Sequence, residues 1–111
     1  MFVNRCGILV RAKQPYVDWA NSFEDDGPIV SLDDQRSTPT PYLIPEHEGA
    51  DVHELVDEWY WENIFAFELN AWMRDPSVWP ENRTADMFHD WFDVELISEL
   101  IDIGKGRIKA S

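Results

Sequence analysis

One stretch of the sequence, residues 51–73, constrains the fold more than any other. Asp51 can cap the start of a helix with Glu54 three residues on, and Pro76 stops helical structure shortly after the stretch. Within it, apolar residues recur three and four positions apart, which is the spacing of one helical face. We therefore predict one long helix whose broad apolar face lies on a sheet. That face comprises Val52, Leu55, Val56, Trp59, Tyr60, Phe67 and Ala71.

A second apolar stripe lies on nearly the opposite side of the same predicted helix, since each residue turns a helix by about 100°. One sheet cannot cover both faces. An exposed row of aromatic residues is typical of protein–protein interfaces, so we expect the stripe to form the interface of a homodimer. The alternative is that it packs within one copy beneath the loops at residues 39–45 and 75–80. The stripe consists of Trp61, Phe65, Leu69 and Trp72.

Shorter patterns predict the other elements. Residues 5–13 alternate between apolar and basic side chains, as a half-buried strand does, and Pro15 suits the first turn of a short helix. Residues 29–32 and 42–44 are two further strand candidates. Thr84 can cap another one or two helical turns.

The stretch at residues 91–103 fits two interpretations. Phe92 and the apolar residues after it alternate with acids as in a strand, yet residues 96–101 also fit a helix that ends at Gly104. We favour the strand, with a bulge at residues 96–97, because aromatic and β-branched residues are dense there. The order strand, helix, strand, strand, helix, strand then predicts an α+β fold, a ferredoxin-like two-layer sandwich with an antiparallel sheet.

Length and composition are typical of one small domain. The chain has 111 residues, of which 44% are hydrophobic, so we expect residues 1–111 to fold around a single core. No cationic start followed by an apolar run opens the sequence, and no window approaches the roughly 18 apolar residues of a membrane span. We therefore expect a cytoplasmic protein. The lone Cys6 agrees with a reducing compartment.

Acidic residues are concentrated in the second half of the chain. Residues 46–102 contain 16 Asp and Glu against only Arg74 and Arg83, and the formal net charge of the whole chain is −13. Such a field repels phosphate groups and anionic lipids, so we expect neither nucleic-acid nor membrane binding. A cationic protein partner, a metal ion or simple solubility remains compatible with the charge.

The densest group of potential metal ligands lies at the start of the long helix. His53 and Asp57 are four residues apart, so both side chains could reach one ion, with His47 or Glu48 added from the preceding loop. This spacing matches no established metal motif. Carboxylates are also favoured at a helix N-terminus by its dipole, and His53 can equally be a surface or capping residue.

Acid–base chemistry could use His89 with the carboxylates that follow it. Nothing selects one pair, and Cys6 lies on the apolar face of its strand rather than in a nucleophile setting. The glycines are scattered, so no phosphate-binding loop is present and we expect no cofactor. Whether the protein is an enzyme stays open. The carboxylates in question are Asp90, Asp93, Glu95 and Glu99.

One block, which begins at Asp75 and ends at Glu95, reads Asp75-Pro76-Ser77-Val78-Trp79-Pro80-Glu81-Asn82-Arg83-Thr84, with Trp91-Phe92-Asp93-Val94-Glu95 further on. It resembles small acidic bacterial proteins of unassigned function that pair a Trp-rich helix with such a loop. The resemblance implies no activity and no site.

Together these patterns predict a small acidic binding or regulatory protein that acts as a homodimer. The alternative is a small metal-dependent or carboxylate-based enzyme with a site near residues 47–57, where His47, His53 and Asp57 lie.

Overall fold

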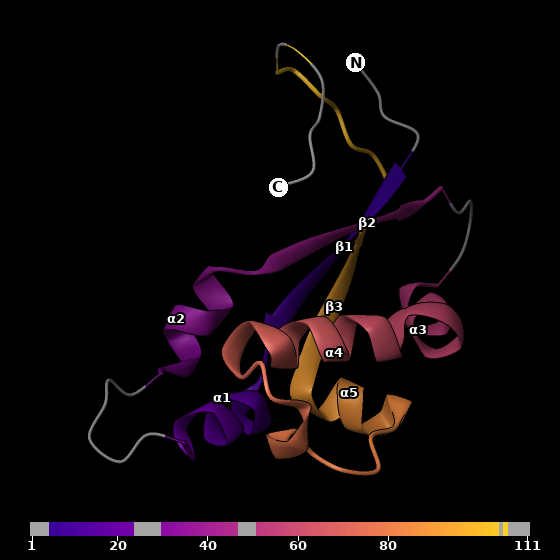
Figure 1. The fold of residues 1–111 in the computed structure, drawn as a ribbon. Coiled ribbons are helices and arrows are strands. Elements are labelled where there is room, and N and C mark those ends of the chain that lie inside the picture. The colour runs from indigo at the N-terminus through magenta and orange to yellow at the C-terminus, as the bar shows by residue number, and fades with distance from the viewer. Residues whose placement is uncertain (1–4, 24–29, 47–50, 105, 107–111) are drawn as a thin grey trace.

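Helices cover one face of a three-stranded antiparallel sheet in the computed structural model, which describes residues 5–23, 30–46, 51–104 and 106 (Figure 1). A π-helical stretch, Val56–Tyr60, joins two of the helices and is called the π segment below. A 3₁₀ turn, Pro76–Val78, precedes the last helix. The strands are β1 (Arg5–Ala12), β2 (Thr40–Pro45) and β3 (Phe92–Ile97). The helices are α1 (Gln14–Asn21), α2 (Leu32–Ser37), α3 (Val52–Leu55), α4 (Trp61–Trp72) and α5 (Ala85–Trp91).

The sheet has β1 at its centre, between β2 and β3. Side chains of β1 alternate as predicted, so that Ile8 and Val10 are buried under the helices while Arg11 lies on the other face. The register places Ile8 opposite Tyr42 and Leu96. The α+β class is thereby confirmed, and so are the helix after β1 and the strand at residues 42–44.

The strand predicted at residues 29–32 is wrong for the part that the structure describes. Val30 and Ser31 belong to no strand, and Leu32 begins α2. The Ser31 hydroxyl accepts a hydrogen bond from the Asp34 N–H at 3.0 Å, so helix capping prevails over the apolar run. Ile29 lies outside the described residues. With three strands in the described ranges, the four-stranded ferredoxin-like arrangement is not seen.

The ambiguous stretch after Trp91 is a strand as far as Ile97, as favoured. Its register with β1 is regular, with Leu96 opposite Ile8 and Ile97 opposite Gly7, so the predicted bulge is absent. The alternative helix at residues 96–101 is absent as well, because the described chain beyond Ile97 contains no helix.

The long helix begins where the sequence predicts, but it is not continuous. The Asp51 carboxylate accepts from the N–H groups of His53 at 2.8 Å and Glu54 at 3.3 Å, which confirms the cap. After the one α-helical turn of α3, the π segment accommodates one more residue per turn than a regular α-helix does. Every residue beyond it is therefore rotated relative to a regular α-helix by about one residue's turn, roughly 100°.

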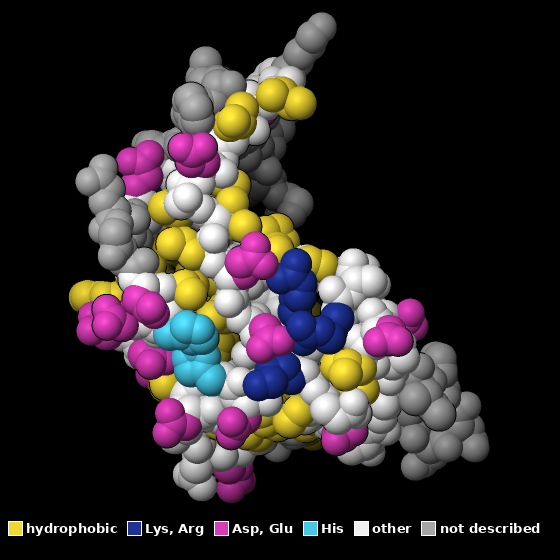
Figure 2. All heavy atoms as spheres, turned by 180° about the vertical axis from the view of Figure 1, so that it is seen from behind, with side chains coloured by type: hydrophobic (Ala, Val, Ile, Leu, Met, Phe, Trp, Pro, Cys, Tyr) yellow, Lys and Arg dark blue, Asp and Glu magenta, His cyan; other side chains and the backbone are white. Residues whose placement is uncertain are grey.

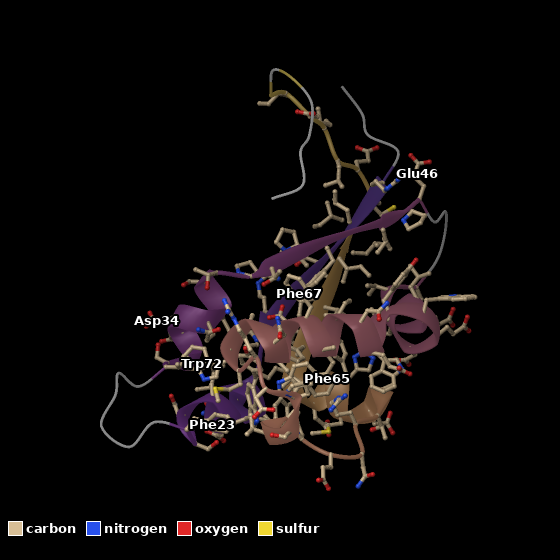
Figure 3. All side chains as sticks on the ribbon, viewed as in Figure 1. Phe23, Asp34, Glu46, Phe65, Phe67 and Trp72 are labelled. Carbon is tan, nitrogen blue, oxygen red and sulfur yellow. The ribbon has the colours of Figure 1, made fainter. Side chains whose placement is uncertain are left out.

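This rotation changes which residues of α4 face the sheet. Val56 is buried before the π segment, and Phe65 and Leu69, each 0% exposed, are buried after it. Phe67, predicted to lie on the sheet, is 60% exposed. The prediction of one sheet-facing stripe from Val52 to Ala71 is therefore wrong from the π segment onward. Phe65 and Phe67 leave α4 on opposite sides (Figure 3).

The core is aromatic where α4 and α5 meet the sheet. The Phe65 ring lies 5.7 Å from Phe88 and 5.6 Å from Phe92, centre to centre, and both contacts are edge-to-face. The Trp72 indole N–H donates to the Ala20 carbonyl of α1 at 3.1 Å. Half of the predicted interface stripe thus lies inside the core, and Trp72 is tied to α1. None of the described helices is long and apolar enough to cross a membrane.

Candidate functional site

An apolar groove runs between β2 and α4 and is called the β2–α4 groove below. Its volume is about 320 Å³. It lies beside β2, which is an edge strand of the sheet, and under the flank of α4 that the π segment turns outward. Its lining residues are Tyr42, Leu43, Ile44, Pro45, Tyr60, Asn63, Ile64 and Phe67.

Phe67 is held in place although it is exposed. Its ring meets Tyr42 of β2 edge-to-face, with ring centres 5.7 Å apart. Ile64, one turn earlier on α4, and Ile44 of β2 are buried at the floor. Leu43 points to the other face of β2 and is 58% exposed at the rim. The groove therefore presents fixed apolar surface to the outside.

Two prolines shape the open edge of β2. Pro41 and Pro45 lie two residues before and two residues after Leu43 in β2, which pairs with β1. Proline has no N–H group to donate to a neighbouring strand. Prolines are accepted in such a strand when their nitrogens face away from the neighbouring strand. Of these three outward positions, only Leu43 therefore offers an N–H group.

Glu68 joins the groove to the core. The Tyr42 hydroxyl donates to Glu68 Oε1 at 2.9 Å, and the Tyr16 hydroxyl of α1 donates to the Glu68 backbone carbonyl at 2.9 Å. Burial raises the pKa of Glu68, while hydrogen bonds from Tyr42 and Thr40 act in the opposite direction. Burial also raises the pKa values of Tyr42 and Tyr16, so both phenols stay protonated donors.

The residues predicted to bind metal are only partly brought together. Asp57, in the π segment, faces His89 of α5, with Asp57 Oδ1 2.5 Å from His89 Nε2. The His53 ring packs against His89 with centres 5.1 Å apart, and the two histidines are seen side by side in Figure 2. His47 lies outside the described residues. Within the described ranges, no group of three or more His, Cys, Asp or Glu side chains is placed to hold a metal ion.

The carboxylate that contacts His89 comes from a distant part of the chain. Asp57 precedes it by 32 residues, so spacing along the sequence could not reveal the pair. Asp93 instead pairs with Arg36 at 2.7 Å, and Glu95 pairs with Arg11 at 3.2 Å. Two of the carboxylates considered for His89 therefore serve ion pairs on the sheet.

A second, polar hollow of about 470 Å³ lies beside α4 and shares Asn63 with the groove. Arg83 borders it, but its guanidinium donates to the Pro80 carbonyl at 2.9 Å and lies over the Trp79 ring. Asn82, also at the border, has a φ of 55°, a left-handed conformation that asparagine tolerates better than most residues. The remaining lining residues are Trp61, Glu62 and Ala66.

The predicted interface residues are distributed between core and surface. Phe65 and Leu69 have no exposed area to offer a second copy of the chain in this conformation. Trp61 and Trp72 are partly buried against the core. Sequence reasoning missed the groove. Its available signals were the two prolines that mark β2 as an edge strand and the aromatic residues on both walls.

Comparison of the chain with protein-family models, with curated proteins and with solved structures finds no significant match.

Proposed function

We propose that the protein is a small acidic binding protein that holds a partner protein in the β2–α4 groove. The observation that carries the proposal is Phe67, an aromatic side chain that is 60% exposed and yet fixed against Tyr42 at the groove. Aromatic anchors in pre-formed apolar grooves dominate the energetics of many protein interfaces.

The surroundings of Phe67 support this function. Ile64 and Ile44 form an apolar floor, and the two groove tyrosines can pack against a partner with their rings. Covering a large apolar side chain contributes about 2 kcal/mol to binding, which is about a thirtyfold change in Kd. Trp59, in the π segment, is 68% exposed but does not line the groove. It offers a matched control.

The decisive experiment is a peptide-display selection on the wild-type protein, followed by affinity measurements on two variants. Phe67→Ser should weaken the selected peptides by about thirtyfold, because their anchor contact is lost. Trp59→Ser, an equally exposed aromatic on the same helical stretch, should leave their affinity unchanged. If no peptide is selected, or if the selected peptides bind Phe67→Ser as well as wild type, the groove is not the binding site.

Homodimerisation, predicted from the sequence, stays an alternative use of this side of the molecule, with changed residues. A dimer formed through this side of the molecule would use Phe67 and Leu43 rather than Phe65 and Leu69. Two copies with a charge of −13 repel each other, so added salt should tighten such a dimer. Light scattering after size exclusion at low and high salt measures this directly.

The alternative function is a small carboxylate-based or metal-dependent enzyme with a site near residues 47–57. It is favoured by the contact of Asp57 with His89, because a carboxylate that orients an imidazole is a common arrangement for a general base. The π segment, which carries Asp57, is a type of distortion that recurs at functional sites. A melting temperature that rises with zinc, nickel or manganese, and no longer rises in His53→Ala, would support the metal-dependent form.

A further inference from the structure

We infer that the occupant of the β2–α4 groove is a short apolar segment of another protein that is flanked by Lys or Arg. The inference rests on the proposed function and adds the chemistry of the partner to it. It is carried by the acidic charge of the chain and by the hydrogen-bond acceptors along the edge of β2.

The lining of the groove is itself uncharged, and the charged residues of the helical stretch beside it are all acidic. The stretch formed by α3, the π segment and α4 contains five acidic residues and no Lys or Arg: Glu54, Asp57, Glu58, Glu62 and Glu68. β2 contains no charged residue, and Glu46 follows its last residue at the end of the strand (Figure 3). The net charge of −13 therefore places a segment in the groove in a negative potential.

Two basic residues, Arg11 of β1 and Arg36 of α2, lie away from the groove. The Arg11 side chain lies on the face of the sheet opposite the helices, where its guanidinium pairs with Glu95. Arg36 pairs with Asp93 on that same face. In Figure 2, which shows the molecule from behind, Lys and Arg side chains gather together with carboxylates. The charges of Arg11 and Arg36 are thus paired with carboxylates on the face of the sheet opposite the helices.

The edge of β2 favours side-chain recognition over strand addition. A partner strand would find the Leu43 N–H between two prolines, so a full ladder cannot form. The outward carbonyl oxygens at Pro41, Leu43 and Pro45 remain available as acceptors. Ammonium and guanidinium groups carry donors only, so Lys or Arg next to an apolar anchor can use these oxygens and the Glu46 carboxylate together.

Charge also separates this occupant from the alternatives. A second copy of the chain brings another −13, and a nucleic acid brings phosphates, so both are repelled where a basic segment is attracted. Complementary charge of this kind raises the rate of association and selects among partners of similar apolarity.

The test uses a displayed peptide library with a constant apolar centre and flanks that vary among Lys, Glu and Ser. We expect enrichment of Lys on the flanks, and binding by these peptides that weakens with added salt. Phe67→Ser should weaken them about thirtyfold. Glu46→Lys, next to the lining residue Pro45, should weaken them about fivefold, whereas Glu81→Lys, an equal charge change in the loop before α5, should have a much smaller effect.

The outcomes separate the two proposals. Enriched peptides with Glu or Ser flanks that still depend on Phe67 would overturn the basic-segment inference and leave the binding function standing. Peptides that bind Phe67→Ser as tightly as wild type would overturn both the basic-segment inference and the proposed binding function. A dimer at high salt that Phe67→Ser dissociates would assign the groove to a second copy and also overturn the inference.

Discussion

Phe65 and Phe67 lie two residues apart on α4, yet the first is 0% exposed and the second 60% exposed. Phe65 contacts Phe88, Phe92 and Trp91 and belongs to the core. Phe67 contacts Tyr42 and borders the β2–α4 groove. One side of the helix therefore stabilises the fold, and the other offers a surface to a partner.

The π segment determines which side of α4 faces the core and which side borders the groove. If all these residues formed a regular α-helix with no π segment, the residues after Tyr60 would be rotated by roughly 100°, and the groove-lining flank would turn toward the sheet. The difference between the two sides of α4 is thus set by a backbone feature that lies before it. Side-chain hydrophobicity does not distinguish the two phenylalanines.

The largest expected effect comes from deletions that change this rotation. Deleting Trp59 removes an exposed residue from the π segment and allows a regular α-helix that keeps Val56 and Phe65 on the same face. Deleting Ala66, within regular α4, rotates Leu69 out of the core. We expect the first protein to unfold cooperatively by circular dichroism and the second to be unfolded or nearly so. Equal loss of structure in both would contradict the role given to the π segment.

A second comparison replaces the two phenylalanines. Phe65→Ala removes a fully buried ring and should lower the free energy of unfolding by about 3 to 5 kcal/mol. Phe67→Ser should lower it by less than about 1 kcal/mol, because the ring is mostly exposed. Urea denaturation measures both values, and Phe65→Leu serves as a milder control if the alanine variant fails to fold. A large loss in Phe67→Ser would place that residue in the core as well.

The smallest expected effect concerns Glu68, whose pKa is raised by burial. The folded protein holds this proton at pH values where the unfolded chain has lost it, so its contribution to stability is present at acidic pH and is lost as pH rises through the folded pKa. Glu68→Gln should therefore gain stability relative to wild type between acidic and neutral pH, by on the order of 1 kcal/mol. The exposed Glu62→Gln is the control, and parallel pH profiles for all three proteins would argue against a raised pKa.

The sequence predicted the elements whose signals are local. Caps at Asp51 and Thr84 are present, and the Thr84 hydroxyl accepts from the Met87 N–H at 3.1 Å. The alternation of β1 and the prolines around β2 also sufficed to identify those strands. Each of these features depends on residues within a few positions of one another.

The groove and the histidine contact could not be predicted in the same way. A prediction from helical periodicity assumes a constant rotation per residue. The π segment breaks this assumption, so the predicted direction of every later side chain is wrong by the same angle. The meeting of Asp57 with His89 depends on how α5 packs, which no spacing along the chain encodes. Ser31 is a case in which a local signal was present but was not used. Its hydroxyl caps α2, so the apolar run around it is the start of a helix and not a strand.

The prolines of β2 also bear on how the protein behaves when many copies are crowded together. Fibril growth requires each sheet edge to supply an uninterrupted row of hydrogen-bond donors and acceptors to the next molecule. On this edge the donors at Pro41 and Pro45 are missing, so of these three positions only Leu43 can donate to the next molecule and a full ladder cannot form. The protein can therefore keep an apolar surface open to solvent on this side without offering a template for aggregation.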